Sequence, residues 1–100
     1  MQQVTIRVLY FGPSRQAVPV PEETVTLPAG ATVGDLFDEL TERHGQPFRD
    51  SVLWVDGNPL PNATIIVDGR NIQHLRGMQT PLERDSATHI VLLTASVGGG

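Results

Sequence analysis

A nearly unbroken apolar run, His89-Ile90-Val91-Leu92-Leu93-Thr94, stands close to the C-terminus. Because apolar and polar residues do not alternate in it, the run predicts a strand that is buried on both faces, or nearly so, at the centre of a sheet. The N-terminal run Val4–Phe11 does alternate, and its buried face would consist of Val4, Ile6, Val8 and Tyr10. The chain therefore needs a sheet whose first strand has one covered side.

The other face of the first predicted strand changes character along its length. It begins with Thr5 and Arg7 but continues with Leu9 and Phe11, so its distal end is apolar where a solvated face would be polar. We expect Leu9 and Phe11 to contribute to an exposed apolar patch on which partner proteins dock. The alternatives are that residues 48–62 or a second copy of the domain cover it.

Shorter patterns predict the remaining strands and loops. Thr24–Leu27 predicts a second strand that forms a hairpin with the first, and Ala63–Val67 with the Asp68-Gly69 turn and Arg70–Ile72 predicts another hairpin. Val52–Val55 favours a brief strand or an anchored loop. Three loop residues are expected to anchor in the core: Leu75, Met78 and Leu82.

Residues 32–45 carry the signals of one amphipathic helix. Thr32 is a good N-cap and Asp35 stands in the capping-box position, so the helix begins at Val33. Gly45 and Pro47 end it. Its apolar stripe consists of Val33, Leu36, Phe37 and Leu40. We expect this stripe to pack on the sheet against Ile6, Val8 and Ile66.

The polar residues of this helix have a structural explanation. Asp38, Glu39, Glu42 and Arg43 form its solvated face in this interpretation, with Glu39 and Arg43 at the i, i+4 spacing of an ion pair. His44 suits the C-terminal end of the helix dipole, and the three histidines of the chain share no metal-ligand spacing. We therefore predict no metal site.

Composition limits the classes of function. One hundred residues with 39% hydrophobic side chains build one domain with a core, and the absence of cysteine excludes disulfides, thiolate metal sites and a cysteine nucleophile. A net charge of −4 argues against nucleic-acid binding. Neither a signal peptide nor an apolar run of the ~20 residues that span a membrane is present, so we expect a cytoplasmic protein.

The chain ends in Ala95-Ser96-Val97-Gly98-Gly99-Gly100. Three glycines have no side chains to pack and lose much backbone entropy on ordering, so we divide the chain into a folded domain, residues 1–94, and a flexible tail, residues 95–100. Fully extended, six residues reach roughly 20 Å. A tail of this kind carries its terminal carboxylate into a narrow active site of another protein. The alternative is a frayed end without function.

The order strand, strand, helix, short strands, strand and glycine tail resembles the MoaD/ThiS sulfur carriers. Four segments carry the resemblance: Val8–Pro13, Ile66–Ile72, Thr80-Pro81-Leu82 and the terminal glycines. The resemblance covers almost the whole chain and is greater to MoaD than to the shorter ThiS-like members. It implies an α+β, ubiquitin-like β-grasp fold, in which one main helix packs across a mixed sheet and the first and last strands lie side by side and parallel.

The family resemblance implies a function for the tail. A ubiquitin-activating-type adenylyltransferase, similar to MoeB or ThiF, would adenylate the Gly100 carboxylate with ATP, and a thiocarboxylate would then form. Gly98 and Gly99 would be the slender stalk, and Val97 would join Leu9 and Phe11 in contacting partners. The chain itself would bind no cofactor and catalyse nothing, and it would pass its sulfur on as the small subunit of molybdopterin synthase, to the large subunit.

Other acceptors stay open at this point. Relatives of MoaD deliver sulfur for the synthesis of cysteine, thiamin or thiolated tRNA, and a protein modifier would join the same activated carboxyl to lysines of target proteins. A plain interaction domain is a further alternative. If a protease removes Gly100, Gly99 takes over the reactive carboxyl.

Overall fold

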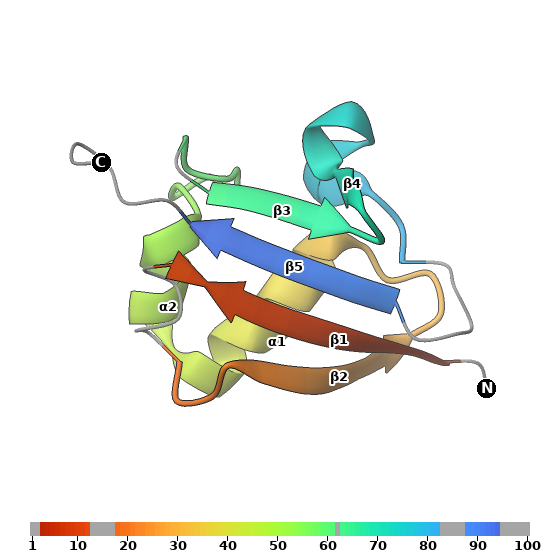
Figure 1. Ribbon diagram of the computed structural model, residues 1–100, viewed down its shortest axis with the longest axis horizontal. Coiled ribbons are helices and arrows are strands. Elements are labelled where there is room, and N and C mark those ends of the chain that lie inside the picture. Colours follow the sequence, from red (N-terminus) through yellow and green to blue (C-terminus); the bar gives the residue numbers. More distant parts are fainter. Residues whose placement is uncertain (1–2, 13–17, 62, 83–87, 95–100) are drawn as a thin grey trace.

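The alternating N-terminal run forms strand β1 (Gln3–Phe11), which pairs in parallel with β5 (Thr88–Thr94). The computed structural model describes residues 3–12, 18–61, 63–82 and 88–94, the last of these ranges by its backbone alone (Figure 1). Val4, Ile6, Val8 and Tyr10 are at most 3% exposed, as the alternation predicts. The parallel pairing of the first and last strands is also confirmed.

The sheet has five strands in the order β2-β1-β5-β3-β4. β2 (Glu22–Pro28) pairs antiparallel with β1, and β3 (Ala63–Val67) pairs antiparallel with both β5 and β4 (Arg70–Asn71). The sheet is therefore mixed, and the apolar run of β5 lies at its centre as predicted. Asp68 and Gly69 join β3 to β4 with φ values of 49° and 87°, which makes the predicted tight turn.

Helix α1 (Val33–His44) begins and ends where the sequence predicts. The Thr32 hydroxyl accepts the Asp35 amide at 3.2 Å and the Asp35 carboxylate accepts the Thr32 amide at 2.9 Å, so the capping box is complete. Gly45, with φ 91°, ends the helix. The predicted stripe of Val33, Leu36, Phe37 and Leu40 is buried to 1% exposure or less.

One predicted contact of this stripe is wrong. Ile65 and Val67 of β3 belong to the core, whereas Ile66 is half-buried on the other face of the sheet. The two adjacent isoleucines invite the error, but polar Thr64 shares the face of Ile66, and apolar Ala63 and Val67 share the face of Ile65. A shift of one residue exchanges the two faces of a strand.

The expectation of a brief strand or an anchored loop at Val52–Val55 holds for the loop from Leu53 on, but the helix that precedes it was not predicted. A second helix, α2 (Gln46–Val52), directly follows α1, and Pro47 occupies its first turn, where the missing amide costs nothing. Phe48 is fully buried and stacks on Phe37 at a ring distance of 6.2 Å. Beyond the helix, Leu53 forms a single bridge with Pro59.

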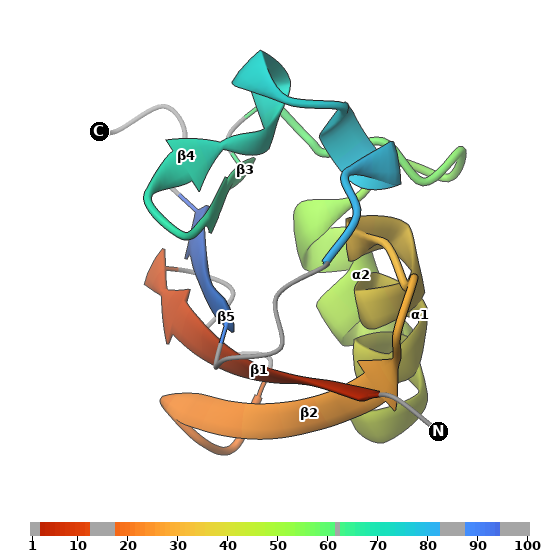
Figure 2. The ribbon, with the colours of Figure 1, turned by 90° about the vertical axis from the view of Figure 1, so that its right-hand side faces the viewer.

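Both helices lie on the same side of the sheet (Figure 2). On that side the short helices η2 (Ile72–His74) and η3 (Gly77–Gln79) lead back towards β5. The predicted loop anchors are confirmed, since Leu82 is buried and Leu75 and Met78 pack against the core at partial exposure. No helix in the described part of the chain is long and apolar enough to cross a membrane.

Candidate functional site

The end of β5 fixes the point from which the glycine tail departs. Leu93 pairs with Phe11 at the end of β1, and Thr94 pairs with Ala63 at the start of β3 (Figure 1). The tail therefore begins at the C-terminal end of the central strand β5, between its neighbours β1 and β3. Residues 95–100 themselves, which include Val97, Gly98, Gly99 and Gly100, lie outside the described residues. Their roles, and the division of the chain at residue 94, stay predictions.

An apolar group faces away from the helices beside this exit. Phe11 is 47% exposed, and Leu9 and Ile66 are half-buried. The register brings the last two into one row, since Leu9 and Ile66 both pair with Val91 of β5. We call Leu9, Phe11 and Ile66 the open-face patch. Sequence reasoning found two of its members and misplaced the third in the core.

The described part of residues 48–62 does not form a cover over the open-face patch. Phe48 packs against Phe37 of α1, and its ring meets Tyr10 edge-on at 6.0 Å, on the helix side of the sheet. Leu53 lines a hollow beside Phe37 on the same side. Figure 2 shows α2 beside α1 and away from the opposite face. The first of the two alternatives to a docking partner therefore fails for these residues.

A buried polar network at the other side of β1 was not predicted. The Glu23 carboxylate accepts hydrogen bonds from the Tyr10 hydroxyl and from His44 Nε2, each at 2.5 Å, and from Arg43 Nη1 at 3.1 Å. The side chains of Glu23 and His44 are only 14% and 8% exposed. The network ties β1, β2 and the end of α1 together.

The network also sets the ionisation of its members. Burial alone would raise the pKa of Glu23, but the hydrogen bonds from Tyr10, His44 and Arg43 outweigh it and hold that pKa below its ordinary value. Burial, and then the bond to Glu23, raises the pKa of Tyr10. Glu23 is thus held ionised and Tyr10 protonated, which suits a structural clamp better than proton transfer.

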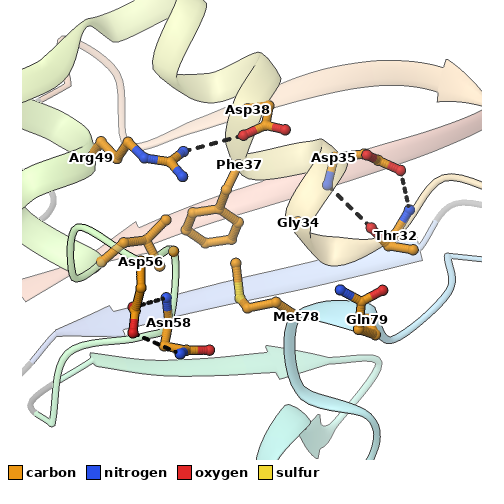
Figure 3. A pocket seen from close by; sticks show the side chains of 12 residues that line it. Thr32, Gly34, Asp35, Phe37, Asp38, Arg49, Asp56, Asn58, Met78 and Gln79 are labelled. Carbon is orange, nitrogen blue, oxygen red and sulfur yellow. Dashed lines mark hydrogen bonds and ion pairs between the residues drawn. The ribbon is translucent and has the colours of Figure 1, made fainter.

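A hollow of about 420 Å³ on the helix side is the other feature to consider (Figure 3). Its charged groups already have partners. Asp35 belongs to the capping box, Asp38 pairs with Arg49 at 3.3 Å, and Asp56 accepts the amide of Asn58 at 3.0 Å. None of the predicted site residues lines it. Among the described residues, no group of three or more metal-ligating side chains is present.

Comparison with known proteins shows the family of the chain. The model of the ThiS family matches residues 8–100, which is nearly the whole chain and includes its glycine end. The chain belongs to the ThiS family. Members of this family are ubiquitin-like sulfur carriers, which work with activating enzymes and sulfur-accepting partners. A search of curated protein sequences found no match.

Solved structures agree with this ThiS-family assignment. The small archaeal modifier protein 1 from Methanosarcina acetivorans is 26% identical, with a TM-score of 0.74 and full coverage of both chains. A Pyrococcus furiosus protein, assigned as subunit 1 of the molybdopterin converting factor, is 28% identical with a TM-score of 0.71, over 93% of this chain and 99% of that one. The β-grasp fold predicted from the resemblance is confirmed.

A third structure resembles this ThiS-family chain in fold alone. It is the BexX/CysO complex from Amycolatopsis orientalis, which is 21% identical with a TM-score of 0.67, over 94% of this chain and 99% of that one.

Proposed function

We propose that this chain is a sulfur carrier whose C-terminal carboxylate is adenylated and then converted to a thiocarboxylate. The observation that carries the proposal is the family match through Gly100, because it joins the β-grasp domain to a terminal glycine run. The reactive group is the α-carboxylate, so no side chain of the chain takes part. The chain itself is not a catalyst.

The chemistry needs a partner because a carboxylate is a poor electrophile. An adenylyltransferase of the ubiquitin-activating type joins the carboxylate oxygen to the α-phosphorus of ATP and releases pyrophosphate. A sulfur nucleophile then attacks the acyl carbon, and AMP leaves. The carrier supplies reach and slimness, which Gly98 and Gly99 provide, and the enzyme supplies the orientation of the reacting groups. The enzyme binds the ATP, and the carrier binds no cofactor.

The destination of the sulfur that we favour is molybdopterin synthesis. The 28% identity to the Pyrococcus furiosus protein supports it, over 93% of this chain and 99% of that one. The carrier then acts as the small subunit of molybdopterin synthase, in the cytoplasm, and the large subunit receives its tail. Transfer of sulfur into cysteine, thiamin or tRNA uses the same carrier chemistry with another acceptor.

Docking on the enzymes uses the open-face patch. Phe11 and Leu9 lie beside the tail exit, so a partner that covers them also receives the tail. Val97 extends this contact along the tail. Because the adenylyltransferase and the sulfur acceptor both need this surface, they bind in turn and exclude each other.

A second candidate function is protein modification. The 26% identity and full mutual coverage with a small archaeal modifier protein favour it. In that role the activated carboxyl of the terminal glycine forms an isopeptide bond with a lysine of another protein. Activation is shared by both candidates, and the acceptor separates them.

Activation is tested first by ATP–pyrophosphate exchange with the adenylyltransferase of the same organism. The intact chain is expected to support exchange, and a chain that lacks Gly99 and Gly100 is not. A chain with one bulky residue appended after Gly100 is the matched control for access to the active site. If the chain that lacks Gly99 and Gly100 supports exchange as well as the intact chain, the tail is not the group that is activated.

A further inference from the structure

All seven basic residues of this chain are arginines, since the sequence contains no lysine, and it contains no cysteine either. Lysine is among the commonest residues of globular domains. The ammonium of lysine and the thiol of cysteine are the side chains that capture activated acyl groups most readily once deprotonated. An arginine guanidinium stays protonated and does not replace them. This chain therefore lacks the two side chains that would react most readily with its own activated carboxyl.

The single tyrosine is removed from reaction by the fold. Tyr10 is 2% exposed and donates its hydroxyl hydrogen to Glu23. Burial and this hydrogen bond raise the pKa of the phenol, so its nucleophilic phenolate form is suppressed. His44 is 8% exposed and bonded to the same carboxylate. The buried network thus encloses two further candidate nucleophiles.

The α-amino group of Met1 is kept away from the tail by the sheet topology. Because β1 and β5 are parallel, Gln3 and Thr94 lie at opposite ends of the sheet (Figure 1). At ~3.3 Å per residue they are roughly 30 Å apart. Joining Gly100 to Met1 would connect Thr94 to Gln3 through nine Cα–Cα steps, which reach about 30–32 Å when fully extended. A chain of residues 1–100 could therefore close on itself only with both ends stretched out straight, which is unfavourable in conformational entropy while the sheet is intact.

We propose that the carrier forms no stable acyl bond to its own side chains, either within one copy or between copies. An amide would form by joining the acyl carbon to an amine nitrogen, with loss of AMP and a proton, and no side-chain amine exists in the chain. The activated tail therefore survives until a sulfur donor or a foreign amine reaches it. Resting on the proposed function, this means that each acceptor amine receives a single copy and that lysine-linked chains of copies do not form.

The test uses the chain of residues 1–100 prepared as a C-terminal thioester, which is activated without any adenylyltransferase. Wild type, Arg76→Lys and the control Arg76→Gln are incubated at high protein concentration and mildly alkaline pH, and the intact mass of each product is measured. Arg76 is exposed, and lysine keeps its charge. A parallel sample with hydroxylamine shows that all three thioesters are equally reactive.

Wild type and Arg76→Gln are expected to hydrolyse, with any amide linked to the α-amine of a second copy. Arg76→Lys is expected to give additional dimers linked through residue 76. Amides or esters at a side chain of the wild type would overturn the proposal, and so would an Arg76→Lys variant that forms no new dimer. Because no enzyme is involved, failure of adenylation in the carrier assay and failure here are separate results.

Discussion

Glu23 illustrates how one side chain can hold three elements of a small domain. It lies on β2, accepts from Tyr10 on β1, and accepts from Arg43 and His44 at the end of α1. A carboxylate that is nearly buried loses hydration, so three donors are needed to offset that cost. Its neighbour Glu22 pairs with Arg7 on the surface, where both side chains are about half exposed.

Replacing this carboxylate tests the network directly. Glu23→Gln is expected to lower the free energy of unfolding by about 1–3 kcal/mol, because the amide nitrogen faces donors and leaves one of them without an acceptor. Glu22→Gln is the matched control, and it is expected to change stability by less than ~0.5 kcal/mol. Urea denaturation of the three proteins measures this. Equal losses in both variants would contradict the network's role.

The pH dependence of stability follows from the same residues. The pKa of Glu23 is lowered in the folded state, so its contribution is present above the ordinary glutamate pKa of 4.5 and is lost as the pH falls through the lower folded value. The pKa of Tyr10 is raised from 10.0, so its contribution is present below pH 10 and declines above it. The difference in free energy of unfolding between wild type and Glu23→Gln should therefore become smaller as the pH is lowered. A difference that becomes larger would contradict the assignment.

Phe11 is the residue on which the proposed docking depends. A Phe11→Asp substitution is expected to weaken binding to the adenylyltransferase by at least ~30-fold, about 2 kcal/mol, because it places a charge in a desolvated contact. Thr5→Asp, at an exposed position on the same face of β1, is the control and should bind normally. Calorimetry measures the affinity of each variant for the adenylyltransferase, and circular dichroism shows whether the variant is folded. Unchanged affinity, or an unfolded Phe11→Asp variant, would each refute the docking role.

At the scale of elements, local signals decided what could be predicted. The capping box, the stripe and Gly45 fix both ends of α1, because each acts within one or two helical turns. Gly45 and Pro47 were interpreted only as the end of α1. They also stand at the start of α2, so that helix was not predicted. Ile65 and Ile66 alone leave the phase of β3 open, whereas polar Thr64, on the face of Ile66, indicates it. Glu23 shared the inward phase of Val25, but its partners lie about twenty residues away in the sequence.

The packing of α1 on the sheet gives a prediction at this scale. Leu36 is fully buried, so Leu36→Ala is expected to cost about 2–5 kcal/mol, from lost burial and from the cavity that remains. Glu42→Ala, on the exposed face of the same helix, should cost far less. Thermal or urea unfolding of both variants compares them. Similar midpoints for Leu36→Ala and the wild type would remove this helix from the core.

At the scale of the molecule, the sheet topology places the tail. The last strand is central and parallel to the first, so the chain leaves the sheet beside Phe11, and the helices occupy the opposite face. One face thus serves stability and the other is available for partners. The alternation in β1 was enough to predict Leu9 and Phe11 on the available face, whereas Ile66 became visible only through the register of β3 and β5.

The central claim is that the terminal carboxyl carries sulfur. The direct measurement is the intact mass of the chain after incubation with its adenylyltransferase, ATP and a sulfur source, with fragmentation to locate any change. We predict the exchange of one oxygen for one sulfur at Gly100, or at Gly99 if the last residue has been removed, and no exchange in a chain that lacks Gly99 and Gly100. Isopeptide conjugates to lysines without a thiocarboxylate, or no change with an enzyme that supports ATP–pyrophosphate exchange, would contradict it.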